Sequence, residues 1–211
     1  MPRSARVQEE GYLHHVVCCG NNGQDLFPSK EDYLKYVTLL KEARRQFPLK
    51  VYNFALVSNH LHLLVEPKQE GSLSSLMQIV TKEYAKYFNK KYDRQGHVFQ
   101  GRFKSFLLQP QPFFFTSSRH IDFDAVNAKI VSDPKDYPWS GYAALAFGKE
   151  CPIRLDEHEL YHNLGKNPAE RQVSYRALVV HFPGETIDFM DRRADIMGDV
   201  KFKRQVRGSG K

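Results

Sequence analysis

The sequence predicts an α+β protein, a ferredoxin-like sandwich with an antiparallel sheet covered by helices, and three observations predict it. Residues 60–67 (HLHLLVEP) alternate between two sets of side chains, as a strand does. Residues 72–91 carry apolar side chains at steps of three and four, as an amphipathic helix does. The predicted elements follow one another as βαββαβα. In that arrangement helices cover one sheet face and leave the opposite face open.

The first strand and the first helix have clear boundaries. Residues 12–20 (YLHHVVCCG) are rich in β-branched and small apolar residues and run into the loop sequence GNNGQ, so we expect a strand followed by a loop. Ser29 and Asp32 have the spacing of a capping box, and apolar residues recur at helical intervals up to Pro48. A helix is therefore predicted between these positions.

The remaining elements complete the predicted order. Residues 50–57 and 60–67 read as two strands joined at Ser58 and Asn59, and the helix at 72–91 follows them. A further strand is predicted over 96–109, with Gly101 as a bulge, and a helix over 113–131. DPKDYPWSGY (133–142) reads as a linker. We therefore predict a main domain over residues 1–145 and a helical extension with a basic tail over 146–211.

Composition restricts the class of protein. The 211 residues are 41% hydrophobic, which suits one main domain. No apolar run approaches the roughly 18 residues of a membrane helix, and the charged amino terminus is followed by no apolar stretch, so we expect a cytoplasmic protein. The three cysteines match no zinc spacing and are expected to be thiols. The net charge of +7 favours polyanionic partners, with nucleic acid first.

Two histidines share one face of the strand at 60–67. Strand alternation places His60 and His62 on the same side, together with Leu64. Imidazole is the commonest side-chain ligand for divalent transition metals, but a site needs a third ligand. A lone pair of this kind is more often two polar residues on an exposed strand face than a metal site. His14 and His15 are weaker candidates, because one of two adjacent strand residues is expected to face outward.

The segment VSNHLHLLVEP resembles the MPNHVHLLV strand of the insertion-sequence-200-like single-strand DNA transposases, and particularly that of the REP-associated tyrosine transposases. YLHHVVCCGNNGQDLF is similar to that family's first strand and loop, and SLSSLMQIVTKEYAKYFNKKYDRQGHVFQGRFKS to its central helix and next strand. DPKDYPWSGY resembles its closing segment. The resemblance covers roughly residues 5–145. It implies single-stranded or hairpin DNA as the partner and, together with a free sheet edge, a homodimer.

The resemblance also implies a metal centre. In that family the His-hydrophobic-His element holds a divalent ion, which polarises a phosphate of single-stranded DNA while a helix tyrosine attacks it. RHIDFDAVNAKIV lines up with the segment that carries the tyrosine, so His120 stands in the tyrosine's place. The implied third ligand lies four residues later, at Asp124. The implied ligands are therefore His60, His62 and Asp124, and a carboxylate there suits Mg²⁺ or Mn²⁺.

Because His120 replaces the tyrosine, the attacking phenol is missing, and three interpretations of the site stay open. In one, the protein is a catalytically inactive relative that binds hairpin DNA or RNA as a regulator. In another, it is an active endonuclease in which His120 acts as a general base or itself attacks phosphorus. In the third, another tyrosine substitutes, although the helical spacing of Tyr84 and Tyr87 favours core packing. A metal-free, RNA-binding ferredoxin-like module is a further alternative. The leading expectation is a metal-dependent, transposase-like protein that binds single-stranded or hairpin DNA and cleaves a strand by transesterification or hydrolysis, with His120 as the catalytic residue.

Basic residues with aromatic neighbours suggest where a nucleic acid strand is held. Cations that follow phosphates and rings that stack on bases provide sequence-tolerant binding. Phe99, Phe103 and Phe106 lie among such cations. The predicted phosphate contacts are Lys82, Lys86, Lys90, Lys91, Arg94, Arg102 and Lys104.

Overall fold

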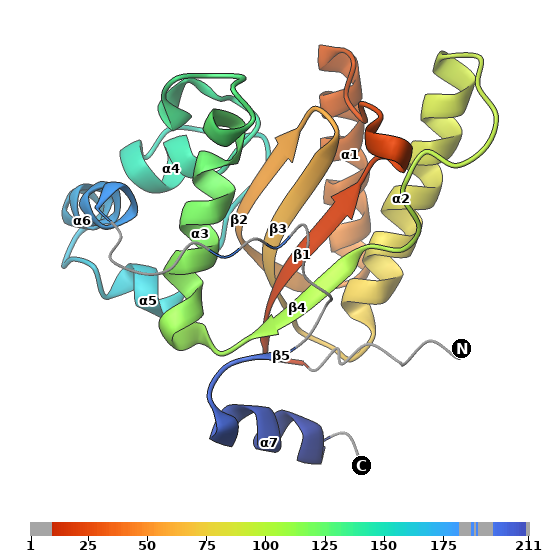
Figure 1. Ribbon diagram of the computed structural model, residues 1–211. Coiled ribbons are helices and arrows are strands. Elements are labelled where there is room, and N and C mark those ends of the chain that lie inside the picture. The colour runs from red at the N-terminus through yellow and green to blue at the C-terminus, as the bar shows by residue number, and fades with distance from the viewer. Residues whose placement is uncertain (1–9, 182–186, 188, 190–195, 210–211) are drawn as a thin grey trace.

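The computed structural model describes residues 10–181, 187, 189 and 196–209, and it contains a five-stranded sheet (Figure 1). Most of the charged amino terminus, on which the expectation of a cytoplasmic protein partly depends, lies outside the described residues. The sheet order is β2-β3-β1-β4-β5. Its first four strands pair antiparallel and β5 pairs parallel with β4. The strands are β1 (Leu13–Cys19), β2 (Leu49–Val57), β3 (His60–Pro67), β4 (Lys104–Leu108) and β5 (Ile196–Met197).

The order of β1 to β4 is that of the predicted ferredoxin-like sandwich, so the predicted fold class is confirmed. The predicted strand over 96–109 is shorter than expected. Gly96 and Gly101 adopt positive φ angles of 93° and 73°, and before β4 begins at Lys104 the segment pairs with the end of β1 through an isolated bridge between Phe99 and Gly20. The helices are α1 (Lys30–Gln46), α2 (Ser72–Lys91), α3 (Pro110–Asn127), α4 (Tyr142–Phe147), α5 (Glu159–His162), α6 (Pro168–Val180) and α7 (Val200–Ser209). Two 3₁₀ turns are η1 (Asn21–Gly23) and η2 (Pro134–Asp136).

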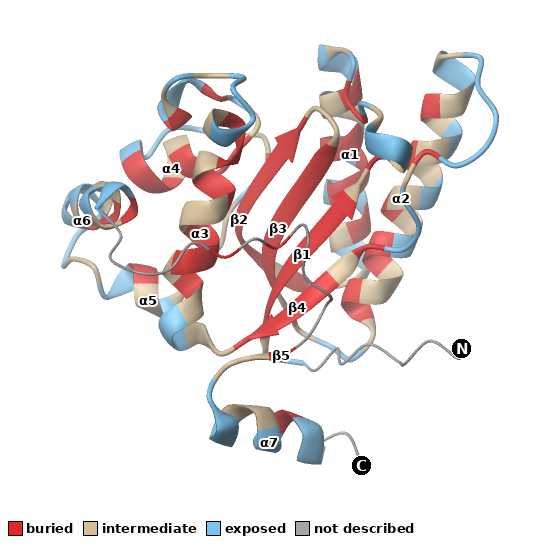
Figure 2. Ribbon diagram, in the orientation of Figure 1, coloured by how far each residue is buried: buried red, intermediate tan, exposed pale blue. Residues whose placement is uncertain are grey.

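Helices cover both faces of the sheet (Figure 1). On one face α1 and α2 pack against a core that includes Leu61, Leu63 and Val65. On the other face α3 and the helices after it pack against a second core that includes Leu64. The expectation of an open second face was therefore wrong, because α3 buries apolar side chains such as Ile121 there. Figure 2 shows the strands buried along most of their length.

Because both faces of the sheet are covered, the expectation that one of the two adjacent histidines of the first strand faces outward was wrong. His14 and His15 point to opposite faces, yet both are fully buried. His14 lies on the α1 and α2 side, where its Nδ1 contacts the Ser105 hydroxyl at 3.1 Å. His15 lies on the α3 side, where its ring packs against Phe106. Neither histidine faces outward as expected.

The edges of the sheet are occupied by other parts of the same chain. β5 pairs with the outer edge of β4. At β2, the Leu56 N–H donates to the Trp139 carbonyl at 2.9 Å, and the Val51 N–H donates to the Asp156 carboxylate at 2.8 Å. The predicted linker thus forms part of the sheet's edge. The homodimer stays a prediction, but the free edge expected to support it is partly covered by the chain itself.

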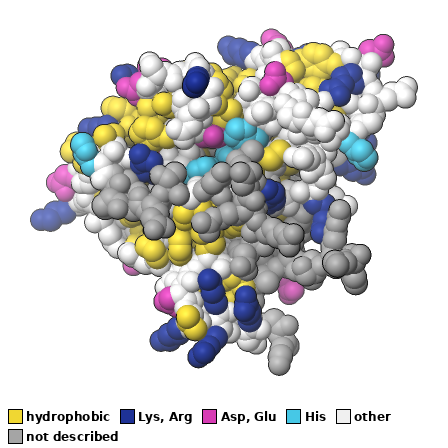
Figure 3. Space-filling model, in the orientation of Figure 1, with side chains coloured by type: hydrophobic (Ala, Val, Ile, Leu, Met, Phe, Trp, Pro, Cys, Tyr) yellow, Lys and Arg dark blue, Asp and Glu magenta, His cyan; other side chains and the backbone are white. Residues whose placement is uncertain are grey.

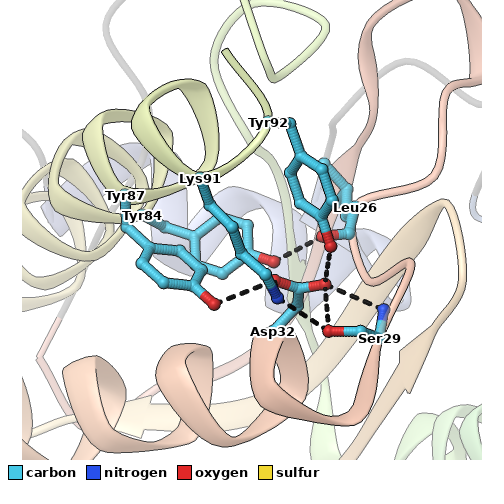
Figure 4. A network of polar contacts seen from close by, with 7 residues as sticks. All are labelled: Leu26, Ser29, Asp32, Tyr84, Tyr87, Lys91 and Tyr92. Atoms are coloured by element: carbon cyan, nitrogen blue, oxygen red, sulfur yellow. Dashed lines mark hydrogen bonds and ion pairs between the residues drawn. The ribbon is translucent and has the colours of Figure 1, made fainter. Parts of the chain in front are cut away.

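A buried carboxylate joins α1 to α2 (Figure 4). Asp32 is fully buried in the first turn of α1 and forms the predicted capping box with Ser29, which is confirmed. Its carboxylate accepts hydrogen bonds from the Tyr92 hydroxyl at 2.6 Å and the Tyr87 hydroxyl at 3.0 Å. The Lys91 ammonium lies 2.8 Å away. These contacts fix the end of α2 against the start of α1.

The carboxylate of Asp32 is expected to make stability depend on pH. Burial alone would raise its pKa, but hydrogen bonds from Lys91, Tyr92 and Ser29 outweigh burial and hold the pKa below its usual range. A carboxyl whose pKa is lowered by folding stabilises the protein above its unfolded pKa, about 3.9, and that stabilisation is lost as the pH falls through the folded pKa. Asp32→Asn should therefore lower the free energy of unfolding by about 3 kcal/mol at pH 7. The deficit should shrink at pH 3.

Urea denaturation at the two pH values measures this effect. Glu83→Gln is the control, because Glu83 forms an ion pair with Lys86 at an exposed position and its replacement should change stability little. A deficit for Asp32→Asn that is equal at pH 7 and pH 3 would contradict the assignment of the effect to the ionised carboxylate.

Candidate functional site

Four histidines and an aspartate gather between the sheet and α3. β3 contributes His60 and His62, β1 contributes His15, and α3 contributes His120 and Asp124. The pairing of β1 with β3 places Val17 directly opposite His62. His15 lies two residues before Val17 and therefore projects from the same face of the sheet as His62. In Figure 3 histidine side chains reach the surface near the middle of this face. We call these five residues the histidine cluster.

His60, His62 and Asp124 present their side chains to one another. Asp124 Oδ2 lies 2.9 Å from His60 Nε2 and 3.5 Å from His62 Nε2. Two ligand atoms that are each about 2.1 Å from an ion and at right angles to one another are about 3.0 Å apart. The His60–Asp124 separation matches this spacing, and the ligand atoms of all three side chains lie within 4.8 Å of one another, close enough to share one ion. His60 is 9% exposed and Asp124 is 8% exposed, so the group borders the surface.

His60 lies between the Asn59 amide and the Asp124 carboxylate. His60 Nδ1 lies 2.6 Å from Asn59 Oδ1, and in the tautomer that donates to this oxygen Nδ1 carries hydrogen. In a neutral imidazole the other nitrogen, Nε2, then carries only a lone pair. Two lone-pair-bearing atoms at 2.9 Å repel each other unless a proton or a cation lies between them. The donor set therefore fits a bound divalent cation.

His62 has the properties of a ligand imidazole. Burial lowers its pKa well below the usual value, and the nearby His15, His120 and His60 lower it further, which favours the neutral ring. Its Nδ1 lies 2.8 Å from His15 Nε2. Its Nε2 is buried and has no hydrogen-bond partner among the residues that the structure describes. That nitrogen points into the space shared with Asp124, where an ion would satisfy it.

His120 lies one helical turn before Asp124 on α3. Its ring centroid is 4.9 Å from that of His62 and 5.7 Å from that of His15. His120 is therefore packed against the cluster and does not lie on the solvent face of α3. His15, His62 and His120 form a second group whose ring nitrogens lie within 4.8 Å of one another. Phe189 stacks on His15 with centroids 3.7 Å apart and lies 5.1 Å from the His120 ring.

A buried network fixes α3 over the sheet. The Asp122 carboxylate accepts hydrogen bonds from the Asn53 amide at 2.8 Å and the Tyr175 hydroxyl at 2.6 Å. Burial raises the pKa of Asp122 to about 7 against the opposing effect of these two bonds. The network connects α3 to β2 and α6, and so it sets the position of His120 and Asp124 relative to β3.

Comparison with known proteins identifies the family. The family model described as "Transposase IS200 like" matches residues 9–117, just over half of the chain. The chain belongs to the IS200-like transposase family. The matched residues include His60 and His62 but end before His120 and Asp124, so the placement of these two depends on the geometry above.

A solved structure has the same fold as this IS200-like protein. It is described as the structure of a REP-associated tyrosine transposase bound to a REP hairpin. The TM-score is 0.60 at 16% sequence identity, and the match covers 74% of this chain and 93% of that chain. No curated protein matches. The predicted membership of the IS200-like family is confirmed, and the predicted resemblance to REP-associated transposases agrees with the similarity in fold.

The cations predicted to contact nucleic acid fall into separate groups. Lys82, Lys86 and Lys90 are exposed on α2, which covers the face of the sheet opposite the histidine cluster. The Lys91 ammonium contacts Asp32 and Ser29 and so has an internal structural partner. Arg94 and Arg102 are exposed in the connection between α2 and β4.

Lys104 lies on the face of the histidine cluster. It is directly opposite Val17 in the pairing of β1 with β4, and Val17 is directly opposite His62 in the pairing of β1 with β3. The three residues therefore form one row across the sheet, with about 4.8 Å between neighbours. Of the predicted cations, Lys104 shares a cross-strand row with a histidine of the cluster.

The tyrosines considered as substitutes have structural roles. Tyr84 is buried and its hydroxyl donates to the Leu26 carbonyl, and the Tyr87 hydroxyl donates to Asp32. Both therefore belong to the α1 and α2 layer, and the predicted core packing of Tyr84 is confirmed. The three cysteines form no disulfide, as predicted. Of the described helices, none is long and apolar enough to cross a membrane.

Proposed function

We propose that this IS200-like protein binds single-stranded or hairpin DNA at the histidine cluster and cleaves one phosphodiester there with the help of Mg²⁺ or Mn²⁺. The cleavage requires no tyrosine at position 120. The observation that carries the proposal is the convergence of His60, His62 and Asp124 on one small volume, with His120 directly beside it.

Two imidazoles and one carboxylate are proposed to hold the ion. His60 Nε2, His62 Nε2 and Asp124 Oδ2 are the ligand atoms, and this mixed nitrogen and oxygen set suits Mn²⁺. When bound, a divalent ion supplies Lewis-acid stabilisation of the negative charge that develops on a phosphate. The partial exposure of His60 and Asp124 supports access of a phosphate to the site from solvent.

His120 is proposed to act as a general base. In hydrolysis a water oxygen forms a bond to phosphorus, the bond from phosphorus to the leaving oxygen breaks, and the proton of the water passes to a base. His120 lies against His62 and one helical turn from Asp124, the position where such a base is needed. Hydrolysis leaves free DNA ends and no bond between protein and DNA. Histidine has the ordinary pKa best suited to this role near neutral pH.

DNA binding is proposed from the family and from charge. The solved structure of similar fold is described as bound to a REP hairpin, which supports hairpin DNA as the partner of this chain. The net charge of +7 favours a polyanion. Lys104 stands about two strand spacings from His62 on the same face, where an ammonium can contact a phosphate next to the one cleaved.

The proposal is tested on the full chain with an end-labelled hairpin oligonucleotide that carries a single-stranded flank. With Mn²⁺ we expect a nicked product and no protein-linked DNA on a denaturing gel, and with EDTA we expect no product. A protein-linked product that disappears when a tyrosine is replaced would contradict the role given to His120. Hairpin binding with no product under either condition would contradict cleavage.

The second candidate function is that of a catalytically inactive, transposase-derived regulator that binds hairpin DNA or RNA. One specific observation favours it: Phe189 stacks on His15 and contacts the His120 ring, so an apolar side chain closes part of the cluster. This candidate predicts hairpin binding that is unaffected by EDTA.

A further inference from the structure

We infer that His15 is a positioning residue that fixes the orientation and the tautomer of His62 and so sets the affinity of the site for a divalent ion. The inference rests on the metal site proposed above. It concerns a histidine that lies outside the proposed ligand set and that contacts the proposed ligand His62.

The contact between the two rings is short and isolated from water. His15 Nε2 lies 2.8 Å from His62 Nδ1, and both side chains are fully buried. His15 stands opposite Leu64 in the pairing of β1 with β3, one two-residue step along β3 from His62. Its side chain therefore reaches His62 diagonally across the strand pair, on the same face. The remote nitrogen of His62, Nε2, then points toward Asp124.

The hydrogen bond has two possible polarities, and only one allows His62 to bind a cation. If His62 Nδ1–H donates to His15 Nε2, His62 Nε2 carries a lone pair and is a ligand. If His15 Nε2–H donates to His62 Nδ1, His62 Nε2 carries hydrogen and cannot be one. At a separation of 2.8 Å one hydrogen lies between the two nitrogens in either polarity. An acceptor nitrogen on His15 therefore stabilises the ligand form of His62.

The His15 ring is itself held in place by aromatic side chains. Phe189 stacks on it with an interplanar angle of 9°, and Phe106 meets it edge to face with centroids 6.4 Å apart. These contacts fix the plane of the ring and so the direction of Nε2. Partners of this kind, which bond the second nitrogen of a ligand histidine, typically change metal affinity by about 10- to 100-fold when they are removed.

Two substitutions at position 15 separate hydrogen bonding from packing. His15→Phe keeps an aromatic ring for Phe189 to stack on but removes the acceptor nitrogen. His15→Gln loses the ring but can place an amide oxygen near the position of Nε2. Calorimetric titration of the full chain with Mn²⁺ should show affinity about 10- to 100-fold weaker for His15→Phe, with much of the loss restored in His15→Gln.

Two further variants serve as controls. His158→Phe is the matched control, because His158 is a half-buried histidine that stacks on Phe114 outside the cluster. It should bind Mn²⁺ as the unchanged protein does. His60→Ala tests the metal site itself. Loss of binding in His60→Ala with unchanged affinity in His15→Phe would overturn the role of His15 alone, and unchanged affinity in His60→Ala would overturn the proposed site.

A measurement on the unsubstituted protein covers the case in which His15→Phe does not fold. Imidazole ¹⁵N and ¹H chemical shifts of the protein saturated with Mg²⁺ report which ring nitrogen carries hydrogen. We expect His62 to be protonated at Nδ1, with that hydrogen bonded to His15 Nε2. Protonation of His62 at Nε2 in the Mg²⁺-bound protein would overturn the inference.

Discussion

Replacing His60 with alanine is expected to remove divalent-ion binding and metal-dependent nicking together. Its Nε2 is 2.9 Å from the Asp124 carboxylate, and removal of the imidazole takes away one of three proposed ligand atoms. Loss of a direct ligand should cost more than loss of a supporting partner, so Mn²⁺ affinity should fall by more than about 100-fold. Calorimetric titration with Mn²⁺ and the labelled hairpin assay measure the two effects.

The fold should tolerate this change, since His60 borders the surface at the first position of β3. His97→Ala is the control, because His97 is exposed in the connection between α2 and β4. It should leave both Mn²⁺ affinity and nicking unchanged. An active, metal-binding His60→Ala variant would show that the ion binds elsewhere.

Replacing His120 with phenylalanine is expected to lower the nicking rate by about 10²- to 10⁴-fold, the contribution typical of a positioned general base. The phenylalanine ring keeps the packing against His62 and Phe189 but cannot accept a proton. Because His120 is not a proposed ligand of the ion, Mn²⁺ affinity should stay close to that of the unchanged protein. Single-turnover nicking rates and titration with Mn²⁺ separate the two effects.

Hairpin affinity provides the control for His120→Phe, since a variant that still binds the labelled hairpin has retained its fold and its DNA surface. Nicking at the unchanged rate would exclude His120 from the chemistry. Loss of Mn²⁺ binding in the same variant would indicate instead that His120 is a ligand, in the second group with His15 and His62.

Short-range sequence patterns predicted much of the fold. The period of two in residues 60–67 placed His60 and His62 on the same face as Leu64, and the structure has them there, since Leu64 belongs to the core beneath α3. The spacing of Ser29 and Asp32 predicted the capping box at the start of α1. Both features depend on residues close in sequence, so periodicity and spacing are sufficient to find them.

Features that depend on distant parts of the chain were harder to predict. His15 was predicted to be a weaker candidate because His14 or His15 was expected to face outward. The prediction failed because the burial of His15 depends on α3 and on Phe189, which lie far along the chain. Lys82, Lys86 and Lys90 were predicted as nucleic-acid contacts from their spacing, but that periodicity does not show which face of the sheet the helix covers. Only the register of β1 with β3 and β4 shows that Lys104 and His62 share one row.

The central claim is that His60, His62 and Asp124 hold one divalent ion. It is tested most directly by anomalous diffraction from crystals of the full chain grown with Mn²⁺. We predict a single strong anomalous peak about 2.1 Å from His60 Nε2, His62 Nε2 and an Asp124 carboxylate oxygen. Well-ordered crystals with no peak at these three atoms, or with the ion bound by His15, His62 and His120, would contradict the claim.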